Sequence, residues 1–106
     1  MKEIKAIIQP FLLDRVLDAL HDIEDLPGIT VSEARAVNMK RGHYEQVVKT
    51  KLEIMVSDSL VAPVIQAIQQ NAHTGNVGDG GIFVIPVEQI INIRTGEQVH
   101  ETASIL

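Results

Sequence analysis

The sequence predicts an α+β domain with a split βαβ architecture, and three observations lead to this fold class. Two strand–helix–strand units follow one another along the chain, which favours an antiparallel four-stranded sheet with both helices on one face. Hydrophobic residues make up 45% of the sequence but aromatic residues only 3%, an aliphatic composition that suits a sheet covered by helices. The 106 residues suffice for one core, so we expect a single domain over residues 1–106.

The first unit begins with a strand over residues 2–8, where Ile4, Ala6 and Ile8 alternate with more polar positions. Pro10 ends this strand. Apolar residues then recur with the spacing of an amphipathic helix, at Leu13, Val16, Leu17 and Leu20. Pro27 and Gly28 predict a turn before the second strand, which is expected from Ile29 to Val37.

The second unit is predicted to begin at Lys49, with a strand to Val56, after a polar loop from Asn38 to Val48. Asp58 or Ser59 is expected to cap the next helix, whose apolar positions are Val61, Val64, Ile65 and Ile68. A strand over residues 82–87 and a short extra strand over residues 90–94 complete the sheet. The polar segment 97–106 is expected to be a mobile tail.

A glycine-rich loop, Thr74-Gly75-Asn76-Val77-Gly78-Asp79-Gly80-Gly81, separates the second helix from the fourth strand. Glycine lets backbone N–H groups approach an anion closely, and such a loop before a buried strand can bind one. A tight turn without a ligand explains the same glycines. The loop does not match the phosphate-binding patterns Gly-x-x-x-x-Gly-Lys-Ser/Thr or Gly-x-Gly-x-x-Gly.

Charge and composition exclude several classes of function. The net charge of −5 disfavours a nucleic-acid binder, although Lys40, Arg41, Lys49 and Lys51 form a local basic cluster. There is no cysteine, and no apolar run is long enough to span a membrane, so we expect no membrane insertion and a cytoplasmic location.

Because both helices cover one face of the predicted sheet, the other face is expected to pack against further copies of the chain.

Six motifs in order resemble the PII nitrogen-regulatory signal-transduction proteins from end to end. They are the opening Met-Lys-Glu-Ile-Lys-Ala-Ile-Ile-x-Pro-Phe, Thr30-Val31-Ser32-Glu33, Gly42-His43, Leu52-Glu53-Ile54, Thr74-Gly75-x-Val77-Gly78-Asp79-Gly80 and Ile93-Arg94-Thr95-Gly96-Glu97. The resemblance implies a ferredoxin-like homotrimer that is not an enzyme. It also implies a sensor that binds adenine nucleotide between subunits, senses 2-oxoglutarate and regulates transporters, enzymes or transcription factors through a protruding loop.

Two sets of residues follow from the resemblance. The residues expected at the nucleotide are Ile7, Gly28, Thr30, Val37, Glu53, Gly78, Asp79, Gly80 and Arg94. Those expected in the loop that meets effector and partner are Met39, Lys40, Arg41, Gly42, His43 and Lys49. Lys49 matches the family's effector-binding lysine.

The chain departs from the family pattern where charge matters most. Gly81, Asn92 and Met39 stand where the family has a lysine and two arginines, and Lys40 replaces the glutamine that completes the magnesium–oxoglutarate site. The segment 38–48 is shorter than the family's loop, and Tyr44 lacks the sequence context of the uridylylated tyrosine. We therefore expect a divergent member that binds AMP or ADP in preference to ATP with magnesium, and no control by uridylylation.

A metal-responsive trimer similar to the divalent-cation-tolerance proteins is the alternative. It would draw on the four histidines, His21, His43, His73 and His100. None of them is spaced at i, i+3 or i+4 from another ligand type in a convincing cluster, except that His43 lies two residues before Glu45. The sequence also contains no Ser-His-Asp arrangement or carboxylate pair that would indicate catalysis.

Overall fold

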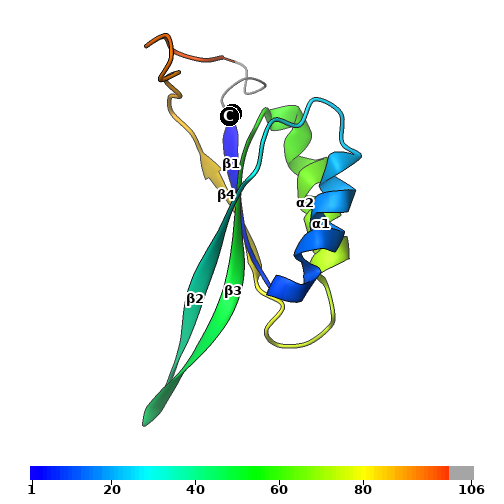
Figure 1. Cartoon of the computed structure of the whole chain (residues 1–106), viewed down its shortest axis with the longest axis vertical. Helices are drawn as coiled ribbons and strands as arrows, with labels where there is room; N and C mark the ends of the chain where they lie inside the picture. The colour runs from blue at the N-terminus through cyan, green and yellow to red at the C-terminus, as the bar shows by residue number, and fades with distance from the viewer. Residues whose placement is uncertain (101–106) are drawn as a thin grey trace.

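The computed structural model describes residues 1–100 as a sheet with two helices on one face (Figure 1). The elements are β1 (Lys2–Ile8), α1 (Leu13–His21), β2 (Thr30–Lys40), β3 (His43–Val56), α2 (Val61–Ala72) and β4 (Gly81–Pro86), with short 3₁₀ turns before each helix. The strands are antiparallel in the order β2-β3-β1-β4. The predicted fold class is confirmed. No helix in residues 1–100 is long and apolar enough to cross a membrane.

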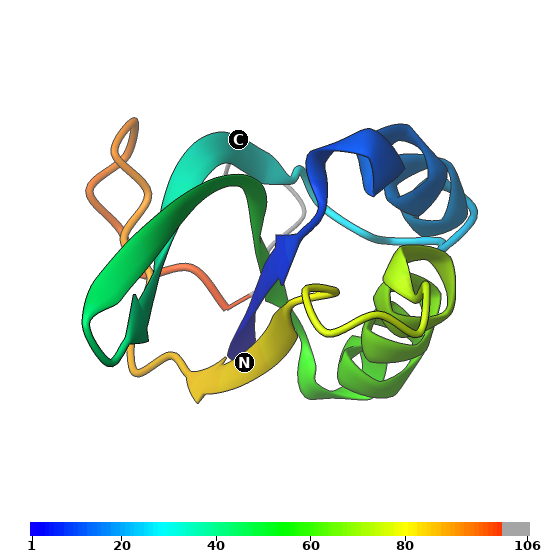
Figure 2. The same ribbon diagram turned by 90° about the horizontal axis from the view of Figure 1, so that it is seen from below.

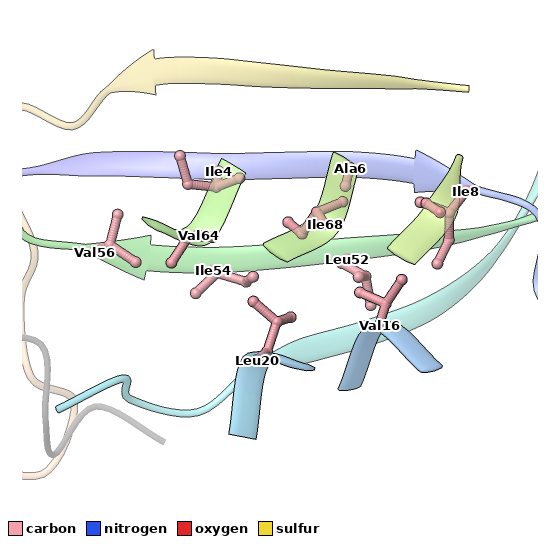
Figure 3. Packing of buried hydrophobic residues seen from close by; sticks show 11 residues of the cluster. Ile4, Ala6, Ile8, Val16, Leu20, Leu52, Ile54, Val56, Val64 and Ile68 are labelled. Atoms are coloured by element: carbon pink, nitrogen blue, oxygen red, sulfur yellow. The ribbon is translucent and has the colours of Figure 1, made fainter. Parts of the chain in front are cut away.

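The core lies between the sheet and the two helices (Figure 3). Alternate residues of β1 and β3 point toward the helices, and the predicted stripes of α1 and α2 meet them. The largest fully buried side chains are Ile4, Ile8, Val16, Leu20, Leu52, Ile54, Val56, Val64 and Ile68. Because side chains alternate across a strand, Lys5, Ile7, Lys51 and Glu53 lie on the opposite side, which we call the open face of the sheet.

The segment from Asn38 to Val48 is not the loop that we predicted. It forms the distal half of a long hairpin, in which β2 and β3 pair without interruption from Thr30↔Glu53 to Lys40↔His43 (Figures 1 and 2). Arg41 and Gly42 form the two-residue turn, and Gly42 has a positive φ of 88°, which glycine adopts without strain. From Val37 to Val48 every side chain is exposed, so no buried face imposed an alternating pattern on the sequence.

Two smaller predictions were also wrong. The turn predicted at Pro27 and Gly28 lies earlier, at Asp22–Asp25 with Asp25 at φ 62°, and Gly28 is in the irregular segment that follows. Neither Asp58 nor Ser59 caps α2, and Lys2 Nζ instead donates to Asp58 at 3.2 Å.

The expected last strand is also absent: residues 90–94 contribute a single bridge pair, Ile91↔Gln98. The Val99 N–H donates to the Ile90 carbonyl, so the beginning of the expected mobile tail folds back on this segment. Residues 101–106 of that tail lie outside the described residues.

Candidate functional site

The glycine-rich loop between α2 and β4 is organised by the carboxylate of Asp79. Its Oδ2 accepts the backbone N–H groups of Thr74 at 2.7 Å and Gly75 at 2.9 Å. Its Oδ1 accepts the Thr74 hydroxyl and, at 3.0 Å, Nε2 of Gln9. The Thr74 hydroxyl and the two backbone N–H groups lower the pKa of the Asp79 carboxyl to about 2. Asp79 therefore stays ionised and joins both ends of the loop.

The tip of this loop is a β-turn whose backbone donors face no protein acceptor. The Asp79 N–H donates to the Asn76 carbonyl at 3.3 Å, which places Val77 and Gly78 at the two central positions. Within residues 1–100, the N–H groups of Val77 and Gly78 have no hydrogen-bond partner in the protein. Two adjacent backbone N–H donors at a turn can together bind an anion.

Gly80 holds the loop tightly against the end of β1. It has a φ of 100°, and a Cβ built at this position would lie 1.8 Å from the carbonyl oxygen of Ile7. Ile7 itself pairs with Gly81, the first residue of β4. Two of the predicted site residues, Ile7 and Gly80, are thus in contact through their backbones, and only glycine fits at Gly80.

Lys49 adds a positive charge to the turn. Lys49, predicted as the first residue of the third strand, lies in β3 and not at the tip of the hairpin with the other residues of the effector set. Its Nζ donates to the Gly78 carbonyl at 2.6 Å. The structure therefore joins one residue from the predicted effector set to one from the predicted nucleotide set, although 29 positions separate them in the sequence.

Thr30 and Glu53 lie beside each other on the open face, as cross-strand partners in the same row as Lys5 and Phe83. The adjacent row on this face contains Ser32, Lys51, Ile7 and Gly81. Glu53 forms an ion pair with Lys51, in which Nζ of Lys51 lies 3.6 Å from Oε1 of Glu53. The row that leads to the glycine loop is two residues further along each strand. A surface at Thr30 and Glu53 that binds the base would therefore lie about 7 Å from that row.

Other predicted nucleotide contacts are not part of this cluster in one chain. Val37 lies in the distal hairpin, where it pairs with Gln46. The segment with Arg94 follows the end of β4 that is remote from the glycine loop (Figure 1). There the Asn92 side chain accepts the N–H groups of Arg94 at 2.8 Å and Thr95 at 3.3 Å, and Gly96 closes the turn. Arg94 is in a turn, not in the strand that we predicted.

The remaining effector-set residues form the tip of the hairpin. Met39 and Lys40 end β2, Arg41 and Gly42 form the turn, and His43 begins β3. Lys40 makes an exposed ion pair with Glu45 at 3.5 Å. Met39 pairs across the strands with Tyr44, and their side chains are 83% and 62% exposed. The tip of the hairpin therefore carries the positive charges of Lys40 and Arg41 next to the exposed apolar side chains of Met39 and Tyr44.

Sequence reasoning missed Gln9, which connects β1 to Asp79, and gave Thr74 no role beyond its motif. A polar residue between a strand and Pro10 gives no signal of a contact 70 positions away. It also missed a cavity of about 300 Å³ between the end of α2 and the start of β4. Ile8, Ile68 and Ile82 line this cavity, so it lies on the helix-covered side and not on the open face with Thr30 and Glu53.

The histidines that support the metal alternative do not gather in the described part of the chain. No group of three or more His, Cys, Asp or Glu side chains is placed to bind a metal ion in residues 1–100. His73 has one carboxylate neighbour, with Nδ1 3.8 Å from Oδ2 of Asp79. The comparisons described next also give the metal alternative no support.

Comparison with known proteins identifies close relatives over almost the whole chain. The family model described as nitrogen regulatory protein P-II matches residues 1–97. The nitrogen regulatory proteins P-II of Azospirillum brasilense and Rhodospirillum rubrum are 49% and 48% identical, each over 92% of this chain and 96% of the relative. That of Bradyrhizobium diazoefficiens is 46% identical, over 92% of this chain and 95% of the relative.

Proposed function

The chain belongs to the nitrogen regulatory protein P-II family, and on this premise we propose that it is a non-enzymatic sensor that controls a transporter or an enzyme. Its signal is a small effector, an adenine nucleotide, bound with its phosphates at Gly78, Asp79 and Gly80, in and directly after the turn whose central residues are Val77 and Gly78. The observation that supports this most strongly is the turn itself, where the N–H groups of Val77 and Gly78 have no partner within residues 1–100 and the Lys49 ammonium lies beside them. The general statement that the chain is a regulatory protein of this family rests on the family match over residues 1–97.

The nucleotide site is proposed to form between subunits of a homotrimer. In one chain, β4 separates the glycine loop from the turn that contains Arg94, a strand of six residues or about 20 Å. A site that uses both groups therefore needs them from different copies. The open face also supports assembly because both helices of the described chain lie on the other side of the sheet (Figure 2). It is not uniformly apolar, since Lys5, Lys51 and Glu53 lie among its residues.

The charges at the site favour AMP or ADP over ATP. Gly81, Asn92 and Met39 replace three cations of the family pattern, which leaves Arg94 from that pattern and Lys49 at the turn. A hydrogen bond to a charged group contributes roughly 1.5–3 kcal/mol, so each missing cation makes an added phosphate less favourable. The nucleotide is an effector and not an obligatory cofactor.

The hairpin is proposed to contact the regulated partner protein through its tip. Lys40 and Arg41 place positive charge at the end of a chain whose net charge is −5, which favours an acidic surface on the partner. The tip is a regular two-stranded structure, so docking does not require a disordered loop to fold first. A Lys40→Glu/Arg41→Glu variant should recover less of the partner from native lysate, and unchanged recovery would count against this contact.

Two measurements test the proposal as a whole. Light scattering of dilute protein should give the mass of a trimer, and a mass near the 11.6 kDa of one chain would contradict assembly. Thermal unfolding should shift upward with AMP or ADP because a ligand that binds the folded state stabilises it. An unchanged melting temperature with millimolar AMP, ADP and ATP would mean that the glycine loop is only a turn.

A further inference from the structure

The carboxylate of Asp79 lies inside the glycine-rich loop and not at its surface tip. We propose that Asp79 is a positioning residue, which holds the N–H groups of Val77 and Gly78 toward a phosphate without touching the ligand itself. This inference rests on the proposed function, because it assigns a role within that nucleotide site. Our expectation placed Asp79 at the nucleotide without assigning a role to its side chain.

The hydrogen bonds of Asp79 leave little of its carboxylate for a ligand. Oδ2 accepts two backbone N–H groups, from Thr74 and Gly75, and Oδ1 accepts the Thr74 hydroxyl and the Gln9 amide. His73 lies on the same side, with Nδ1 3.8 Å from Oδ2. The side chain of Asp79 is only 21% exposed. A phosphate next to an unscreened carboxylate would be repelled, whereas these donors offset much of its negative charge.

The position of Asp79 in the chain explains how it shapes the turn. Its backbone N–H closes the β-turn on the Asn76 carbonyl, while its side chain bonds back to Thr74 and Gly75. The segment between these anchors is fixed at both ends. Val77 and Gly78 are therefore held at the tip with donors that no protein group uses in the described residues. A loop with such preorganised donors binds an anion without first paying the entropy of ordering.

Gln9 fixes the loop to the sheet. Its amide reaches Asp79 from the residue that follows β1, close to the place where Gly80 packs on the Ile7 carbonyl. Lys49 anchors the same turn from β3 through the Gly78 carbonyl. The donors at the tip thus have a defined position relative to both central strands of the sheet.

The variant Asp79→Asn tests this role with almost no change in side-chain size. An amide can still accept from the Thr74 hydroxyl and Gln9 through its one oxygen, but its NH₂ group would face the two backbone N–H donors. We expect the full-length variant to bind ADP at least tenfold more weakly, with an unchanged oligomeric mass. Asp58→Asn is the control, because Asp58 bonds to Lys2 and lies in the turn before α2, outside the glycine loop.

Thr74 provides a graded second test. Thr74→Val removes the hydroxyl donor but keeps the shape, and should weaken ADP binding less than Asp79→Asn does. Thr74→Ser keeps the hydroxyl and should restore wild-type affinity. If Thr74→Ser bound as weakly as Thr74→Val, the hydroxyl bond to Asp79 would not be what positions the loop.

Amide NMR separates positioning from a general structural role. In wild type, the Val77 and Gly78 amide signals should shift when ADP is added, and the Thr74 and Gly75 amides should exchange slowly with or without ADP. In Asp79→Asn the slow exchange and the ADP-induced shifts should both be lost. Wild-type-like ADP affinity in a folded Asp79→Asn protein would overturn this inference alone. Absence of ADP binding by wild type would overturn the proposed function as well.

Discussion

The ammonium of Lys49 donates a 2.6 Å hydrogen bond to the carbonyl of Gly78 and so joins the base of the hairpin to the glycine turn. The first residue belongs to β3, which continues outward to the tip at Arg41 and Gly42. The second belongs to the turn proposed to bind phosphate. A ligand that attracted the ammonium away from the carbonyl would therefore act on the strand that leads to the partner-binding tip.

Replacing Lys49 by methionine should weaken ADP binding roughly ten- to a hundredfold, since a hydrogen bond to a charged group contributes about 1.5–3 kcal/mol. Methionine keeps the length of the side chain and removes its charge. The matched control is Lys40→Met, because Lys40 is paired with Glu45 at the far end of the hairpin. Calorimetric titration checks the prediction. Equal ADP affinities for wild type and Lys49→Met would show that this lysine does not face the phosphates.

Gly80→Ala should lower the free energy of unfolding by about 2–5 kcal/mol, because the new methyl group would meet the Ile7 carbonyl and the residue would keep a positive φ. Gly42→Ala is the control for the effect of the positive φ alone. It also has a positive φ, but no atom lies within 4 Å of its Cβ position, so we expect a loss of only about 1–2 kcal/mol. Urea denaturation measures both, and an equal loss in the two variants would contradict the close packing on Ile7.

The contribution of Asp79 to stability should depend on pH in a narrow acidic range. Its pKa is lowered from an ordinary value of 3.8 to about 2 in the folded chain, so the stabilisation is complete well above pH 3.8. It is then lost as the pH falls from about 3.8 to about 2. The difference in unfolding free energy between wild type and Asp79→Asn isolates this carboxyl from others that titrate nearby. A difference that stayed constant down to pH 2 would contradict the lowered pKa.

The hairpin should be structured in the free protein. Cross-strand-bonded amides between Val37 and Val47 are expected to exchange with deuterium more slowly than those of Val77 and Gly78, which have no acceptor within residues 1–100. Tyr44→Ala should speed exchange near the tip, because the Met39–Tyr44 pair contributes roughly 0.2–1 kcal/mol there. Exchange of the hairpin amides as fast as that of Val77 would mean that the tip is a disordered loop.

The sequence predicted those parts of the fold in which one face of an element is buried. The strand over residues 2–8 was predicted with its observed bounds, and the apolar stripes of both helices were identified, because the core demands apolar residues at regular intervals. The hairpin beyond Val37 was missed for the opposite reason. Both of its faces are exposed, so its polar sequence resembles that of a loop, and the pairing comes from the two-residue turn at Arg41-Gly42.

The candidate site was predictable only in part, since it depends on contacts between distant segments. The glycines and Asp79 were identified from their motif, but the role of Asp79 within the loop required the positions of Thr74 and Gln9. Lys49 was expected at the start of a strand, but its contact with Gly78 depends on a loop 29 positions away. The pattern predicted a strand at Arg94, whereas the structure has a turn there.

Calorimetric titration of the wild-type protein with AMP, ADP and ATP tests the central claim most directly. The claim is that an adenine nucleotide binds with its phosphates at the Gly78–Gly80 turn, with Arg94 supplied by another copy of the chain. We predict saturable binding, with AMP or ADP tighter than ATP, and loss of that binding in Arg94→Ala. No measurable heat from any of the three nucleotides at millimolar concentration would contradict the claim.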